Sequence, residues 1–124
     1  MIDDKLVKIL ADIGFMASGV GLPKNAFAIF NGIEKARPDS PVPSIGFAME
    51  FMNRKRHQEA IDILHKDGLA KDPDNITVKA FIGMGLMLEG RNKESEDILT
   101  TLLNCGDPET EVMAQELLNN IQSA

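Results

Sequence analysis

The chain has 124 residues, of which 44% are hydrophobic, enough for the core of one ordinary domain. Its 19 acidic and 13 basic side chains leave a net charge of −6, which argues against nucleic acid or an anionic membrane as partner. The single cysteine excludes an intrachain disulfide, and no apolar run reaches the roughly 18 residues that insert into a bilayer. We therefore expect one cytoplasmic domain over residues 1–124.

Apolar residues recur with a helical period along the whole chain, and no stretch alternates as a β-strand does. The breaks between the periodic segments are rich in glycine, proline or charge, as is typical of turns between helices. The pattern predicts helices over residues 3–18, 23–36, 41–53, 57–69, 75–89, 92–104 and 108–122.

The helices belong to a repeat of about 35 residues. Prolines beside an aspartate mark its period, at positions 38, 73 and 108. Small residues recur in the same phase and would let the two helices of a hairpin approach closely; they are Gly14, Ala48 and Gly83, then Ala26, Ala60 and Ser95. We predict an all-α fold of three hairpins over residues 6–38, 41–73 and 76–108, closed by a capping helix over 108–122.

This pattern resembles the tetratricopeptide repeat, in which Leu-Gly on the first helix is followed by Ala-x-x-x-Phe on the second and by a closing proline. The first unit carries Ile13-Gly14, Ala26-x-x-x-Phe30 and Pro38 in that order. The later units keep the small residues and the proline but replace the aromatic by leucine, at Leu64 and Leu99.

A narrower resemblance covers about the whole chain. The segments from Asp12 to Phe30 and from Asn53 to Ala60, with Arg37-Pro38 and Gly106 to Pro108, look like the small tetratricopeptide proteins of bacterial type III secretion systems. That family includes cytoplasmic chaperones of the needle subunit and related apparatus proteins, which serve virulence. The resemblance implies a secreted, self-polymerising helical subunit as partner, together with a second small co-chaperone.

In a tetratricopeptide stack the first helix of each unit lines a concave groove. Projected onto this chain, the pattern predicts a groove lined by Ala11, Phe15, Ile45, Met49, Met52, Ala80, Met84, Met87 and Leu88. Flexible, polarizable methionine side chains can accept an amphipathic helix without a fixed fit. The alternative interpretation is that these methionines pack in the core. The candidate contacts for the co-chaperone are Leu6, Val7, Ile9 and Leu10.

The sequence offers no set of residues for catalysis, and we expect no enzymatic activity, no cofactor and no metal. His57 and His65 have no framework of carboxylates or cysteines around them, and Cys105 has no histidine near it in sequence. The basic segment from Arg54 to His57 is interpreted as a solvated turn or, alternatively, as a contact for an acidic partner.

The function that the repeat phase, the methionines and the resemblance together favour is a type III secretion chaperone. It would hold an amphipathic helix of the needle subunit in the groove and keep that subunit monomeric. Two alternatives stay open. One is a structural component of the secretion apparatus that forms homo-oligomers through exposed apolar stripes, and the other is a translocator-type chaperone.

Overall fold

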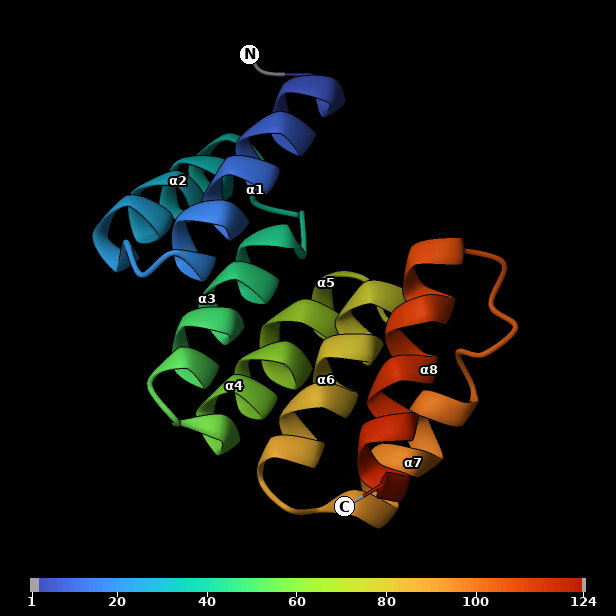
Figure 1. Cartoon of the computed structure of the whole chain (residues 1–124). Coiled ribbons are helices and arrows are strands. Elements are labelled where there is room, and N and C mark those ends of the chain that lie inside the picture. The colour runs from blue at the N-terminus through green and yellow to red at the C-terminus, as the bar shows by residue number, and fades with distance from the viewer. Residues whose placement is uncertain (1–2, 124) are drawn as a thin grey trace.

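The computed structural model describes residues 3–123, in which every regular element is a helix. Within this range three hairpins follow one another. They are α1 (Asp4–Gly19) with α2 (Pro23–Ala36), α3 (Val42–Asn53) with α4 (His57–Ile63), and α6 (Ile76–Leu88) with α7 (Asn92–Thr100). The last helix, α8 (Pro108–Ser123), packs against α6 and α7 at the C-terminal end (Figure 1). The predicted all-α arrangement of hairpins and a closing helix is confirmed.

Side-chain caps explain where several helices begin. The Asp3 carboxylate accepts a hydrogen bond of 2.9 Å from the backbone N–H of Leu6 at the start of α1, and Asn75 caps α6 in the same way. At the start of α8, the Thr110 hydroxyl and backbone N–H both donate to Asp107. These two hydrogen bonds stabilise the ionised carboxylate and therefore hold the pKa of Asp107 below its usual value.

Each hairpin turns by the same backbone motif. An N–H reaches back five residues to a carbonyl of the first helix, from Leu22 to Ala17, from Arg56 to Phe51 and from Arg91 to Leu86, each at 2.8 Å. The residue before each of these N–H groups has a left-handed conformation, with φ of 79° at Gly21, 61° at Lys55 and 83° at Gly90. The turns are Schellman motifs that recur in the phase of the sequence repeat.

Two helices differ from their predicted extents by more than one residue at an end. The segment predicted as one helix over 57–69 is divided into α4, a π-helical turn (Leu64–Gly68) and α5 (Leu69–Lys71). Gly68 lies in this turn against Val78 of α6, where an added Cβ would be 3.1 Å from the valine side chain. Helix α7 ends at Thr100, before the predicted residue 104, and the hydroxyls of Thr100 and Thr101 bond to carbonyls of its last turns.

The core is divided among clusters that follow the hairpins. The first joins α1 and α2 around Phe30, the second joins α3, α4 and α6 around Leu64 and Ile82, and the third joins α6, α7 and α8 around Leu99. The small residues lie where the helices approach most closely. A Cβ added at Gly83, for example, would be 2.5 Å from Cδ2 of Leu99.

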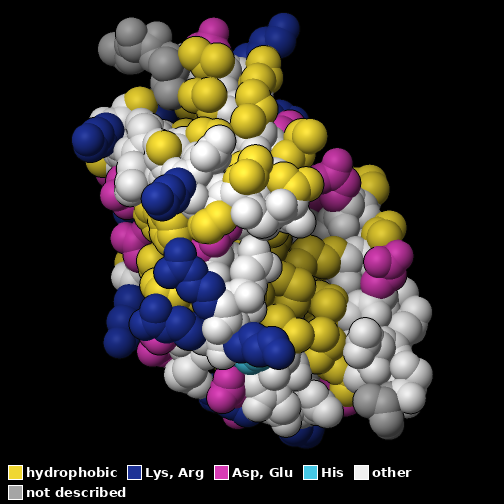
Figure 2. Space-filling model, turned by 60° about the vertical axis from the view of Figure 1, so that its left-hand side comes forward, with side chains coloured by type: hydrophobic (Ala, Val, Ile, Leu, Met, Phe, Trp, Pro, Cys, Tyr) yellow, Lys and Arg dark blue, Asp and Glu magenta, His cyan; other side chains and the backbone are white. Residues whose placement is uncertain are grey.

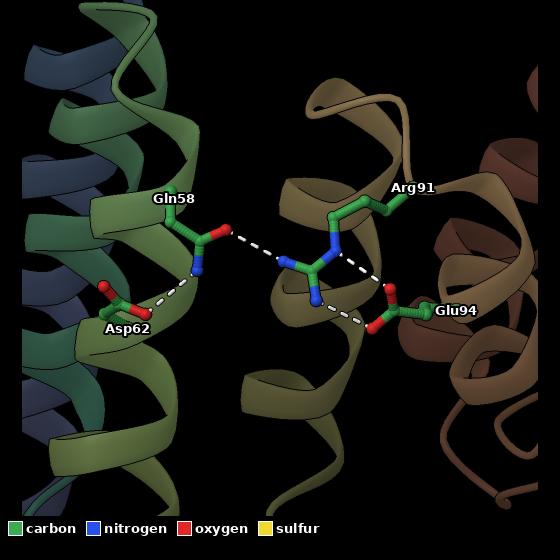
Figure 3. A network of polar contacts seen from close by, with 4 residues as sticks. All are labelled: Gln58, Asp62, Arg91 and Glu94. Carbon is green, nitrogen blue, oxygen red and sulfur yellow. Dashed lines mark hydrogen bonds and ion pairs between the residues drawn. The ribbon is translucent and has the colours of Figure 1, made fainter.

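Polar contacts join neighbouring hairpins. Between the first and second, the buried Ser18 hydroxyl donates to the buried Glu50 carboxylate. Between the second and third, Arg91 donates from Nη1 to Oε1 of Gln58 on α4 at 2.8 Å (Figure 3). The same guanidinium donates two further bonds to Glu94, at 2.9 and 2.7 Å. These bonds raise the pKa of Arg91 and lower that of Glu94.

Candidate partner-binding groove

The first helices of the hairpins lie next to one another on one face of the molecule. Figure 1 shows α1, α3, α6 and α8 following one another across the molecule, and the tertiary contacts join α1 to α3, α3 to α6 and α6 to α8. The space-filling view, turned by 60°, shows a hollow whose floor is made of hydrophobic side chains (Figure 2). This inner face is therefore where a groove is available to a partner.

A cavity of about 390 Å³ opens between α1, α3 and α6. Apolar side chains form its wall: Val7, Ala11, Phe15, Val42, Ile45 and Phe81. Its rim is polar and includes Asp4, Lys8, Arg37, Ser40, Asn75 and Thr77. Arg37 donates to Asp4 at 2.5 Å across this rim, which joins the start of α1 to the segment after α2. The cavity is large enough for one or two apolar side chains of a partner. Its rim carries both acidic and basic side chains.

The structure brings three predicted groove residues together in this cavity, namely Ala11, Phe15 and Ile45. Ala11 and Ile45 have little exposed surface and also belong to core clusters, whereas Phe15 is half-buried. Val42 and Phe81, which complete the apolar wall, were not predicted. Phe81 is one residue beyond the predicted Ala80, so the phase assigned to α6 was shifted by one residue there.

Two residues predicted to line the groove are instead part of the core, so the prediction is wrong for them. Met52 is 7% exposed, and its Cε fills the space left by Gly85, 3.4 Å from where a Cβ would be. Ala80 is fully buried in the cluster that α6 forms with α7 and α8. Both positions are covered because a neighbouring helix packs directly over them.

The remaining predicted positions keep accessible surface. Met84 and Met87 are half-buried and pack at the margins of core clusters, while Leu88 at the end of α6 is exposed. Met49 is also half-buried, but it belongs to none of the core clusters found within residues 3–123. Of the methionines predicted to line the groove, Met49 is therefore the one whose side chain is least engaged in the core and most available to a partner.

A second apolar surface lies on α1, at the N-terminal end. Of the predicted co-chaperone contacts, Leu6 and Ile9 are exposed, whereas Val7 is buried and Leu10 is half-buried in the first cluster. The exposed surface continues over residues that were not predicted as contacts, namely Ile13, Met16, Val20 and Leu22. Figure 2 shows hydrophobic side chains gathered at this end, at the top of the view.

We call Leu6, Ile9, Ile13, Met16 and Val20 the α1 stripe. Their spacing of three, four, three and four residues is the spacing of a coiled-coil seam, and this signal was present in the sequence. Helix α1 packs through Val7, Ala11 and Gly14, and this leaves the α1 stripe on its outer side. A cavity of about 300 Å³ lies along the stripe, between α1 and Ile29 of α2.

Within residues 3–123, no three His, Cys, Asp or Glu side chains gather as metal ligands would. Cys105 is half-buried, with its Sγ 4.0 Å from the carbonyl oxygen of Asp107. No helix in the same range is both long enough and apolar enough to cross a membrane.

The class that the fold defines is an all-α protein of stacked helical hairpins. No family model matches the sequence, and no curated protein matches it either. Among solved structures, this chain is similar to a chain in the structure of the heterotrimeric complex which regulates type III secretion needle formation. The TM-score is 0.72 with 19% sequence identity, and the match covers 95% of this chain and 98% of that chain. At this identity the likeness shows a shared fold.

Proposed function

We propose that this protein is a cytoplasmic chaperone of a type III secretion system, a binding protein and not an enzyme. Its groove would hold an amphipathic helix of a self-polymerising secreted subunit, the needle subunit, and keep it monomeric. The observation that carries the proposal is the apolar cavity between α1, α3 and α6, which opens on the inner face. The end-to-end similarity to a chain of a complex that regulates needle formation supports the same assignment.

The chemistry of the groove fits an amphipathic helix. Such a helix presents apolar side chains at every third or fourth residue, and these can enter the cavity beside Phe15 and contact Met49 further along the face. Covering the apolar face of a subunit that would otherwise assemble is what keeps the subunit soluble. The polar rim with Asp4 and Arg37 would contact the hydrophilic edge of the bound helix.

The α1 stripe supports a second partner. Of the eight large hydrophobic side chains that are exposed within residues 3–123, six lie on the first hairpin or its turn. The C-terminal end of the stack is closed by α8, whereas the stripe leaves the N-terminal end open. An end repeat without a polar outer face needs a cover. We propose that a small helical co-chaperone covers the α1 stripe. Its own apolar residues, spaced alternately three and four apart, would pack against the stripe as in a coiled coil.

Substitution Met49→Glu tests the groove. We expect it to weaken binding of the needle subunit from the same secretion system about tenfold or more, because a carboxylate must lose its water against an apolar helix. The measurement is isothermal titration calorimetry, with circular dichroism to confirm unchanged helix content. The matched control is Val112→Glu on α8, which places the same charge at an exposed apolar position that was not predicted to line the groove. Equal affinities of Met49→Glu and the wild type would contradict the proposal.

The α1 stripe is tested by the double substitution Ile9→Glu with Met16→Glu. Both side chains are exposed, so the fold should tolerate the change. We expect the wild-type chain alone to self-associate reversibly in light scattering, because the stripe is uncovered, and the double variant to be monomeric. Adding the co-chaperone should dissociate the wild type. A stable homo-oligomer that the co-chaperone does not dissociate would favour the scaffold alternative instead.

A further inference from the structure

The turn between α3 and α4 consists of three consecutive basic residues, Arg54, Lys55 and Arg56, which we call the basic turn. All three side chains are exposed. The equivalent residues are Val20, Gly21 and Leu22 in the first hairpin, and Glu89, Gly90 and Arg91 in the third. The concentration of positive charge is therefore specific to the middle hairpin and is not a requirement of the turn.

Lys55 occupies the left-handed position of its turn, with φ of 61°. Glycine occupies the equivalent position in the other two hairpins, at Gly21 and Gly90. A side chain with a Cβ is strained in this conformation, whereas glycine is not. The middle turn thus keeps a lysine where the same backbone geometry favours glycine. A side chain held in a strained conformation at an exposed turn points to a role beyond folding.

The two arginines are held in place by aromatic rings. The guanidinium carbon of Arg54 lies 5.3 Å from the ring centroid of Phe27 on α2, and that of Arg56 lies 5.4 Å from the ring centroid of Phe51 on α3. Phe27 in turn stacks on Phe47, with 5.7 Å between the ring centroids. The cations are therefore partly ordered before any partner arrives, which lowers the entropy lost on binding.

The basic turn has charge left for a partner. Arg56 forms a two-pronged pair with Glu59, at 2.5 and 2.6 Å, and Arg91 is likewise paired with Glu94 in the third hairpin. In the described part of the chain, neither Arg54 nor Lys55 lies within ion-pair distance of a carboxylate, although the whole protein carries a net charge of −6. Two uncompensated cations side by side in an acidic protein are an electrostatic match for carboxylates.

From these observations we propose that the basic turn binds a short acidic segment of a protein partner, through Arg54 and Lys55. The overall charge of −6 repels a long polyanion or an anionic membrane, whereas two or three carboxylates span only the patch itself. Figure 1 shows the hairpin turns along the same edge of the molecule, at the ends of α1, α3 and α6. The site lies outside the groove, and the inference does not depend on which helix the groove binds.

The test uses the full chain and a fluorescein-labelled peptide of six glutamates, measured by fluorescence anisotropy at low ionic strength. We expect Lys55→Gly to weaken binding about threefold, and Arg54→Ala with Lys55→Gly about tenfold, as partly exposed ion pairs do. Binding by the wild type should fall as salt is added. The matched control, Lys35→Ala, removes an exposed lysine from the far end of α2 and should bind as the wild type does.

Thermal unfolding separates this role from a structural one. Lys55→Gly relieves the left-handed strain, so we expect its Tm to rise by about 2 °C while its peptide affinity falls. The reverse change, Gly90→Lys, should lower the Tm. Unchanged affinity of Lys55→Gly, equal loss in Lys35→Ala, or a lowered Tm of Lys55→Gly would overturn the proposal. It would also be overturned by binding of an oligonucleotide or of anionic vesicles in place of the peptide.

Discussion

Gly46→Ala is expected to lower the free energy of unfolding by about 3 kcal/mol, although alanine is ordinarily the better helix former by up to ~1 kcal/mol. A Cβ at position 46 of α3 would lie 2.4 Å from Cδ2 and Cε2 of Phe30 on α2. Phe30 is fully buried and packs against the rings of Phe15 and Phe47. Its ring has no free space to move into, so α3 must shift away from α2.

Urea denaturation followed by circular dichroism measures this loss, and Gly32→Ala is the matched control. Gly32 is an exposed residue of α2, and no described side chain lies within 4 Å of a Cβ built there. This substitution should raise the free energy of unfolding by about 0.5–1 kcal/mol, because alanine loses less backbone entropy than glycine. Two changes of the same chemical type would thus have opposite signs. Destabilisation by both, or by neither, would contradict the proposed close packing at Gly46.

The second large effect is expected from Phe30→Ala, which should lower the free energy of unfolding by about 4 kcal/mol. Removing this ring leaves a cavity between α1, α2 and α3, bordered by the helix backbones at Gly14 and Gly46. Two glycines cannot extend side chains into the space, so the cavity can shrink only if the helices move. Phe27→Ala is the control, since Phe27 is half-buried and should cost about half as much.

The two predictions can be joined in one measurement. In the double variant Phe30→Leu with Gly46→Ala, the smaller side chain makes room for the added methyl group. We expect this variant to be more stable, by at least about 1 kcal/mol, than the sum of the two single losses predicts. Strict additivity of the two losses would mean that Phe30 and Gly46 do not share the same space.

Much of the helix pattern follows from local chemistry. The extent of α2 was predicted to the residue, because Pro23 favours the first helical turn and Pro38 disfavours its continuation. The divided helix from α4 to α5 was not predicted. Its π-helical turn arises where Gly68 meets Val78, which is a contact between two hairpins.

The candidate groove was predictable only in part for a similar reason. Helical spacing identified the face of α3 that carries Ile45, Met49 and Met52, and the structure distributes these residues between the cavity wall, a half-open position and the core. Helical spacing predicts from which side of the helix each side chain projects, with an error of about one residue in the sequence. Whether a side chain in a given direction is buried depends on which helix packs against it. Met52 of α3 is buried because α6 packs over it at Gly85.

The amino-acid pattern alone was sufficient for most of the helices and for their repeat of about 35 residues, because both can be recognised from apolar periodicity and recurring small residues along the chain. Tertiary packing decided which apolar faces stay open. Helix α8 covers Ala80 at one end of the stack, whereas the α1 stripe at the other end has no such cover within the described residues. The same apolar periodicity thus builds core at one end and an exposed surface at the other, since burial depends on what stacks against a helix.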